Sequence, residues 1–327
     1  MHYNAKIYEK AENEIKRRNE EAMETYERRV SEIRKRAPEI AKLCISLSQT
    51  SVKLTEAIIN GGNNTAKLIE EIKNNNLQTQ EKIRTYLREF GFGEDYLEIP
   101  YTCKKCKDTG SVMGDMCDCF KELLKKLSVD ELNSNSKITL HDFSEFRIDY
   151  YPETGMGDFS PRKQMQAVYD FCVEYVESFN EHSASLLFKG KTGLGKTFIS
   201  SAIAKNLIER GFSVVFDSVQ NIIRSIENEH FGRSEGNTME VVSQADLVIL
   251  DDLGSEFVSG FTSSVIYNLL NDRINLQKPV IISTNFSNAE LDKIYNERII
   301  SRISSFFPIQ FEGKDIRQII LKNQSGN

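Results

Sequence analysis

The residues with the clearest chemical signature are 190–197, which read GKTGLGKT. They fit the pattern GxxxxGK followed by Ser or Thr, in which glycines let backbone N–H groups turn toward phosphate oxygens. In such a loop Lys196 reaches the β and γ phosphates, and the hydroxyl of Thr197 is a ligand for Mg²⁺. The pattern therefore predicts a site for ATP and Mg²⁺. The predicted nucleotide-binding residues in this loop are Gly190, Thr192, Gly193, Gly195, Lys196 and Thr197.

Two acids follow directly after a short apolar run, residues 247–250. Because α/β sheets bind ligands at the carboxyl ends of their strands, both carboxylates are expected near the nucleotide. We predict that Asp251 holds Mg²⁺, directly or through water, and that Asp252 orients and deprotonates the water that attacks the γ-phosphate. Asn285 follows another apolar run, and its amide is predicted to position the same water.

Two arginines lie four residues apart in the segment ERIISRI, residues 297–303, so Arg298 and Arg302 share one face of a helix. Their spacing leaves two interpretations open. Either they form structural ion pairs with Glu297 or Glu290, or they reach the nucleotide of a neighbouring subunit and neutralise charge on the transferring phosphoryl group.

Four of the six cysteines lie within 17 positions, as a CxxC pair and a CxC pair separated by ten residues. They are Cys103, Cys106, Cys117 and Cys119. Each pair can bind one edge of a tetrahedral Zn²⁺ ion, and four thiolates close the coordination sphere, which predicts a structural zinc site. A redox pair or plain thiols are the alternatives, although no strand precedes the CxxC pair as redox motifs usually require.

The elements that must position these residues alternate between strand and helix from about residue 163 onward. The predicted strands are 186–189, 213–216, 247–250 and 279–283, and the predicted helices are 165–179, 196–210, 219–226 and 263–275. Short apolar strands that alternate with helices predict a parallel sheet covered on both faces.

The first hundred residues are charged and helical, with a heptad seam of apolar or small residues from Tyr26 to Leu47. Pro38 interrupts that seam, so we expect a break near Ala37. The glycines within 60–64 and 91–93 are expected to end two further helices. The composition predicts a helical bundle or hairpin, which either is solvated all round or docks a partner protein.

Together the phosphate loop, the Asp251–Asp252 pair, the strand end at Asn285 and ERIISRI resemble an AAA+ ATPase. The continuation LVILDDLGSEF and the upstream SPRKQM are similar to DnaC/DnaI-type replicative helicase loaders and their IstB-like relatives, over roughly residues 140–320. The resemblance implies that Lys196 and Thr197 form Walker A, Asp251 and Asp252 Walker B, and Asn285 sensor 1. It further implies that Arg302 is the arginine finger and Arg317 sensor 2. Asp252 stands where most AAA+ proteins have Glu.

The family resemblance also implies single-stranded DNA binding by subunits that associate through their AAA+ domains. It points to Ser259 and Phe261, in the loop after Walker B, and to Phe231 as DNA contacts. An exposed aromatic ring can stack on bases without reading their sequence. On the residues alone, Phe257 and Phe261 are equally consistent with core positions under the sheet.

The 42 basic and 48 acidic residues of this 327-residue chain give a net charge of −6, and no apolar run is long enough to span a membrane. We therefore expect a soluble, cytoplasmic protein. The expected organisation is a helical partner-docking region (1–97), a zinc module (98–122), an irregular linker (123–160) and an α/β AAA+ domain (161–327). The 42 residues after Asn285 are too few for a full helical lid, so a truncated lid is expected.

These features predict an ATP-dependent loader of the hexameric replicative helicase, which binds ATP, Mg²⁺ and single-stranded DNA during replication initiation. Its ATP hydrolysis is expected to be slow and stimulated by DNA or by oligomerisation. The alternative functions are an IstB-like ATPase that assists a transposase, a non-hydrolysing nucleotide-gated adaptor, and a P-loop kinase for a small metabolite.

Overall fold

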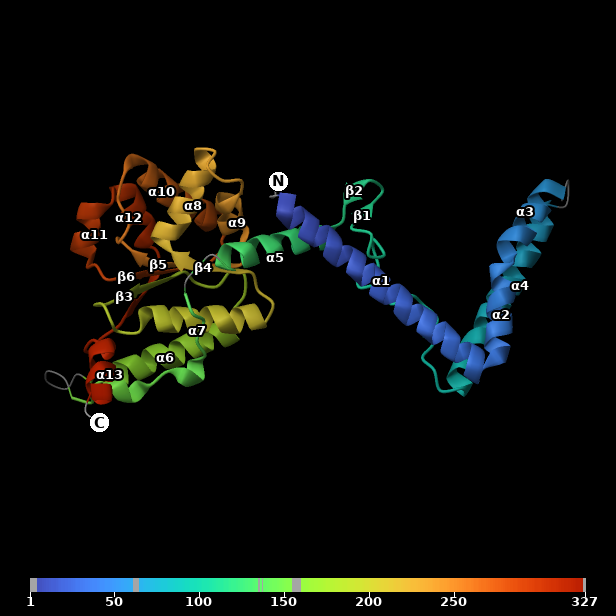
Figure 1. The fold of residues 1–327 in the computed structure, drawn as a ribbon, viewed down its shortest axis with the longest axis horizontal. Coiled ribbons are helices and arrows are strands. Elements are labelled where there is room, and N and C mark those ends of the chain that lie inside the picture. The colour runs from blue at the N-terminus through green and yellow to red at the C-terminus, as the bar shows by residue number, and fades with distance from the viewer. Residues whose placement is uncertain (1–4, 61–64, 135, 137, 155–159, 326–327) are drawn as a thin grey trace. The chain divides into compact units, whose positions relative to one another are not determined.

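The computed structural model describes residues 5–60, 65–134, 136, 138–154 and 160–325 (Figure 1). The chain divides into two compact units, which we describe one at a time. One unit is Glu12–Phe120, and the other combines Met1–Ala11 with Lys121–Asn327. No helix in the described ranges has the length and apolar character needed to cross a membrane.

The larger unit is built on a sheet of five parallel strands in the order β4-β5-β6-β3-β7. These strands are β3 (Leu186–Lys189), β4 (Val214–Ser218), β5 (Leu247–Leu253), β6 (Val280–Thr284) and β7 (Phe307–Gln310). The predicted parallel sheet is therefore confirmed. Strand β7 is not among the predicted strands. Only Ile309 of this strand is buried, and its four residues form no continuous apolar run.

Helices cover both faces of this sheet, as predicted (Figure 1). Phe188, Ile249 and Ile281 belong to a core shared with α6 (Pro161–Glu177) and α7 (Lys196–Glu209). Leu187, Val248 and Ile282 belong to the opposite core, since successive strand residues point to opposite faces. The helices on that second side are α8 (Val219–His230), α9 (Thr238–Gln244), α10 (Gly260–Asn275), α11 (Asn288–Ile294) and α12 (Glu297–Ile303).

The segment expected to be an irregular linker contains a helix instead, α5 (Asp118–Ser134), followed by the short 3-10 turns η2 (Phe143–Glu145) and η3 (Ile148–Tyr150). Val129 packs into the sheet core. The Asn133 amide donates to the carbonyl oxygen of Val214 (2.6 Å) and accepts from the N–H of Phe216 (3.0 Å). These bonds pair backbone groups on the free edge of β4. Tertiary contacts therefore stabilise α5, although the polar composition of its segment indicated a loop.

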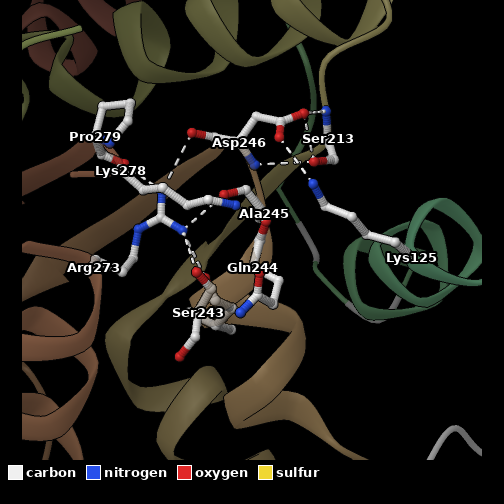
Figure 2. A network of polar contacts seen from close by, with 10 residues as sticks. Lys125, Ser213, Ser243, Gln244, Ala245, Asp246, Arg273, Lys278 and Pro279 are labelled. Carbon is white, nitrogen blue, oxygen red and sulfur yellow. Dashed lines mark hydrogen bonds and ion pairs between the residues drawn. The ribbon is translucent and has the colours of Figure 1, made fainter. Parts of the chain in front are cut away.

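A buried arginine joins the amino ends of β5 and β6 (Figure 2). Arg273 is fully buried, and its guanidinium donates to five carbonyl oxygens, those of Val242, Ser243, Ala245, Asp246 and Pro279. Burial lowers the pKa of Arg273 to about 9. The carboxylate of Asp246 also accepts from Ser213 and from Lys125 of α5. This network stabilises the side of the sheet at which the strands begin, opposite their carboxyl ends.

The smaller unit is helical at its N-terminal side, as expected. Its helices are the main part of α1 (Ala5–Arg36), α2 (Pro38–Ser48), α3 (Thr50–Asn60) and α4 (Thr65–Glu89). The break near Ala37 is confirmed, with φ −141° at Ala37 and Pro38 at the first position of α2. Gly91, with φ +78°, follows the end of α4, also as predicted. The predicted stop at 60–64 lies largely outside the described residues.

A candidate nucleotide site and a candidate zinc centre

A cavity of about 650 Å³ lies at the carboxyl ends of β3, β5 and β6. The helix that follows β3 covers one face of the sheet and the helices that follow β6 cover the other, although β3 and β6 are neighbours. Such a switch point opens the crevice in which α/β proteins bind ligands. The predicted residues that the structure brings together in its lining are Thr192, Gly193, Gly195, Lys196, Thr197, Asp251, Asp252, Asn285 and Arg317.

The glycines of the 190–197 loop are required by close packing. A Cβ atom on Gly190 would lie 2.5 Å from the carbonyl oxygen of Phe311, and one on Gly195 would lie 2.8 Å from the hydroxyl of Tyr151. Both glycines have positive φ, which favours glycine. Helix α7 begins directly after Gly195, so its unpaired N–H groups and positive dipole end lie at the cavity.

The ammonium group of Lys196 is buried against neutral acceptors. Its Nζ donates to the carbonyl oxygens of Gly190 (2.6 Å) and Lys191 (2.9 Å) and to Oδ1 of Asn285 (2.6 Å). Burial lowers the pKa of Lys196 to about 8, although nearby carboxylates act in the opposite direction. No carboxylate of the described residues bonds directly to this buried cation, so an incoming anion would stabilise it and the position favours a phosphate group.

The two acids take different partners. Asp251 accepts from the hydroxyl of Thr197 through Oδ2 (2.8 Å) and from that of Ser283 through Oδ1 (2.5 Å), and burial raises its pKa. Asp252 accepts from the side-chain amide of Asn285 (2.7 Å). The Thr197 hydroxyl and the Asp251 carboxylate are adjacent hard oxygen donors, and this donor set fits Mg²⁺.

The apolar end of the cavity comes from residues that the sequence did not single out as a site. Phe146, Tyr150 and Ile316 line it, together with Glu145 and Arg147. The aromatic residues were visible in the sequence, but they carry no spacing pattern that links them to the phosphate loop. Their segment is the expected linker, which therefore contributes a wall of the site.

Tyr151 connects this segment to the phosphate loop. Its side chain is 1% exposed, and its hydroxyl donates to the carbonyl oxygen of Leu194 (2.9 Å). The backbone oxygen of Tyr151 in turn accepts from Arg162 of the SPRKQM segment (2.9 Å). Tyr151 is therefore held in place beside the 190–197 loop, next to the aromatic residues that line the cavity.

The two arginines of α12 lie apart from the cavity lining. Arg302 donates to Oδ1 of Asn271 (2.9 Å) and lies 5.6 Å from the ring centre of Tyr267. Arg298 is exposed. Glu290, one of the partners considered from the sequence, accepts instead from the N–H and hydroxyl of Ser287.

The candidate DNA contacts fall into two environments. Phe231 is 56% exposed, and its ring centre lies 5.9 Å from that of the half-buried Phe261, with Arg233 stacked 5.4 Å over Phe231. Phe261 also packs on the sheet core. The Ser259 hydroxyl caps α10 by accepting from the N–H of Thr262 (3.1 Å). Phe257 is 86% exposed, which excludes the core position considered for it.

The four cysteines of the predicted zinc module converge. Their sulfur atoms all lie within 4.8 Å of one another, with Cys103 and Cys117 at 3.9 Å and Cys106 and Cys119 at 3.5 Å. Sulfur atoms about 3.8 Å apart are expected around tetrahedral zinc, because Zn–S bonds are about 2.3 Å long. Four converging thiols are the donor set of a structural zinc site, so the residues present fit this ion.

Backbone hydrogen bonds hold the segment around the cysteines in place and lower the pKa of Cys106, whereas burial raises the pKa of its partner Cys119. Asp108 is 2% exposed and accepts from the N–H groups of Thr102 and Cys103, both at 2.8 Å. Burial alone would raise the pKa of Cys106, but hydrogen bonds from the backbone of Gly110 and from neighbouring thiols hold it at about 7. The strands β1 (Ser111–Val112) and β2 (Asp115–Met116) form the hairpin that brings the two cysteine pairs together.

Comparisons with known proteins find similarities to part of the larger unit. The family described as IstB-like ATP binding protein matches residues 155–303. The replicative helicase loader DnaC of Escherichia coli (strain K12) is 30% identical over 132 residues, which cover 40% of this chain and 54% of that protein. The replicative helicase loader DnaI of Bacillus subtilis (strain 168) is 28% identical over 167 residues, covering 46% and 54%.

The chain spans about half the length of these curated relatives. A solved crystal structure of the DnaC helicase loader aligns with a TM-score of 0.44 at 22% identity, over 52% of this chain and 98% of that chain. Residues 155–303 of this chain thus match the family of IstB-like ATP binding proteins, and the chain is similar to the replicative helicase loaders DnaC and DnaI over 40% and 46% of its length.

Proposed function

We propose that this protein is an ATP-dependent loader of a replicative DNA helicase, and that it binds ATP with Mg²⁺ and single-stranded DNA during replication initiation. The observation that carries the proposal is the meeting of Lys196, Thr197 and Asp251 in one cavity, at the start of α7. The names of its homologues support the choice of helicase loading over other uses of the same ATP site.

The chain binds the nucleotide through two walls of the cavity. The phosphate groups contact the N–H groups at the start of α7 and the ammonium of Lys196, while the adenine base packs on Phe146 and Tyr150. Arg317, at the start of α13 (Ile316–Ser325), contributes a further positive charge to the lining. Thr197 and Asp251 would hold Mg²⁺, which when bound stabilises negative charge on the phosphate oxygens.

Hydrolysis depends on the remaining acid and amide. Asp252 accepts from Asn285, so its carboxylate is oriented within the cavity and can take a proton from the attacking water. Asn285 also accepts from Lys196, which links the base to the phosphate-binding cation. Asp is one methylene shorter than the Glu of most AAA+ proteins, and we expect slow turnover that DNA or self-association stimulates.

Self-association would add an arginine from a neighbouring subunit to those that already line each cavity. Arg302 does not line the cavity of its own chain, and α12 presents it half-buried beside Tyr267. We propose that Arg302 contacts the nucleotide of a neighbouring subunit, as an arginine finger does.

The variant Arg302→Ala is expected to bind ATP as tightly as the wild type and to lose its oligomer-dependent hydrolysis, by roughly 10³-fold or more. Hydrolysis rates measured over a range of protein concentrations check this. Arg298→Ala, four residues earlier on α12, is the matched variant. If Arg298→Ala loses the concentration-dependent rate and Arg302→Ala retains it, the assigned arginine is wrong.

Single-stranded DNA is proposed to contact the cluster formed by His230, Phe231, Arg233 and Phe261, with Ser259 close to it in sequence. The three rings of the cluster contact one another, since the ring centre of His230 lies 5.0 Å from that of Phe231 and 5.3 Å from that of Phe261, and Arg233 lies over the ring of Phe231. An exposed aromatic ring beside an arginine offers stacking and charge to a nucleic acid, without sequence readout.

We expect Phe231→Ala to weaken binding of an oligo-dT strand by about 5- to 150-fold, since base stacking contributes about 1–3 kcal/mol. Fluorescence anisotropy measures this at one fixed salt concentration. Phe307→Ala is the control, because Phe307 is equally exposed (53%) but stacks on Phe171, away from the cluster. Equal losses in both variants would remove the assignment.

The helices of residues 1–97 are proposed to dock the helicase, next to a zinc module at residues 98–122. Apolar side chains on α2–α4 remain in solvent, among them Ile45 (57% exposed), Ile59 (73%) and Leu77 (55%), and they suit a protein partner. Co-purification with a hexameric replicative helicase, lost when residues 1–95 are removed, tests the whole proposal. Capture of a transposase in its place would favour the transposition function.

A further inference from the structure

The pairing of strands β5 and β6 is irregular at Asp251 and Asp252. Leu250 pairs with Ile282, but the next pair is Leu253 with Thr284. Two residues of β5, Asp251 and Asp252, therefore stand opposite one residue of β6, which is Ser283. This is a β-bulge, and Asp252 has φ +60°, in the left-handed region that non-glycine residues rarely adopt.

The bulge has a direct consequence for the acids. In a regular strand successive side chains point to opposite faces, so two consecutive carboxylates would not meet one ligand. Here both Asp251 and Asp252 line the same cavity. The chain must therefore hold β5 in this unusual conformation for both acids to act on one nucleotide.

Ser283 provides the hydrogen bonds that stabilise this conformation. Its hydroxyl accepts from the N–H of Asp252 (2.9 Å), which replaces the ladder bond lost at the bulge, and donates to Oδ1 of Asp251 (2.5 Å). The side chain is 1% exposed, so water does not readily take over either bond. One hydroxyl thus contacts the backbone of one acid and the side chain of the other.

We propose that Ser283 is a positioning residue for the magnesium ion, an inference that rests on the proposed ATP site. With Oδ1 of Asp251 held by Ser283, the other oxygen stays directed to Thr197, at 2.8 Å. With its N–H held, Asp252 keeps the backbone conformation from which its carboxylate reaches Asn285, at 2.7 Å. Ser283 also belongs to the cavity lining, but both hydrogen bonds of its hydroxyl go to the two acids, so its effect on the ion is exerted through them.

The test compares two buried hydroxyls on the same strand. Ser283→Ala removes the hydroxyl that contacts both acids. Thr284→Val removes a fully buried hydroxyl that donates to the carbonyl oxygen of Leu253 (2.8 Å) and accepts from the N–H of Phe286 (3.2 Å). The full-length variants are titrated with a fluorescent ADP analogue, once with Mg²⁺ and once with EDTA, and their melting temperatures are recorded.

Ser283→Ala is expected to reduce the gain in affinity that Mg²⁺ provides by about tenfold, the lower end of what loss of a residue behind a metal ligand costs. Its affinity in EDTA should stay within about twofold of the wild type, since the phosphate loop is unchanged. Thr284→Val should lower the melting temperature but keep the full magnesium gain. This pair of results would assign the effect to positioning and not to lost stability.

The inference is overturned if Ser283→Ala keeps the magnesium gain of the wild type, or if Thr284→Val loses as much of it. Failure of the proposed function gives a different result, because the wild type itself would then bind no nucleotide or show no magnesium gain. The two failures are therefore distinguished by the wild-type titrations.

Discussion

Lys196→Ala is expected to abolish detectable ATP binding, with a loss of affinity on the order of 100-fold or more. Hydrogen bonds to charged groups contribute about 1.5–3 kcal/mol each, and a lysine in this loop contacts two phosphates. The side chain is 7% exposed and converges on the phosphate loop and Asn285, so water cannot reproduce its charge there. Titration with a fluorescent ATP analogue measures the loss.

Lys205→Ala is the matched control for this experiment. Lys205 lies on the same helix, outside the cavity lining, and pairs with Asp142 at 3.1 Å. Its replacement removes one positive charge from α7 and should leave ATP affinity within about twofold of the wild type, because its ion pair is partly solvated. If Lys196→Ala and the wild type bind ATP equally, the assigned site is wrong.

Cys106→Ser is expected to reduce bound zinc from one ion per chain to nearly none and to unfold the segment around residues 101–120. Structural zinc binding is worth about 10–16 kcal/mol in zinc-finger peptides, and folding of such small modules depends on it. Two short strands and a buried Asp108 are too little to replace this contribution. Zinc content after extensive dialysis, with limited proteolysis of the same samples, gives the measurement.

Cys44→Ser provides the comparison, because Cys44 packs beside the helical core of the smaller unit and lies outside the sulfur cluster. It should retain the full zinc content. The ATP affinity of Cys106→Ser is expected to stay near that of the wild type, since none of the four cysteines lines the nucleotide cavity. Equal zinc in Cys106→Ser and the wild type, or none in the wild type, would contradict the zinc centre.

Several features of this protein follow from stretches of sequence that are contiguous. The phosphate loop was predictable because one strand, one turn and one helix start, all within residues 186–197, contain its whole geometry. The break at Ala37 follows from Pro38 alone, and the cysteine cluster from two short pairs joined by a turn-rich segment. In each case neighbours in the chain are also neighbours in space, so residue type and spacing carry the information.

Other features depend on register between segments that are far apart. The sequence shows Asp251 and Asp252 in succession, but only the pairing of β5 with β6 makes a bulge there and sets Ser283 behind it. The aromatic residues near Tyr151 fall within the expected linker, because nothing in the local sequence connects them with Leu194. Likewise, contacts with the free edge of β4 stabilise α5, and the composition of α5 does not reveal these contacts.

The difference between the features that the sequence predicts and those that it does not has a physical cause. Backbone preferences and ligand spacing act over a few residues, so they specify the phosphate loop, the metal-binding pairs and most strands and helices directly. Which strand lies beside which, and which hydroxyl meets which carboxylate, depends on burial and hydrogen bonds between distant segments. In this chain local preferences specify the loop of the proposed ATP site, and contacts between distant segments bring Asp251 and Asp252 into the lining of one cavity.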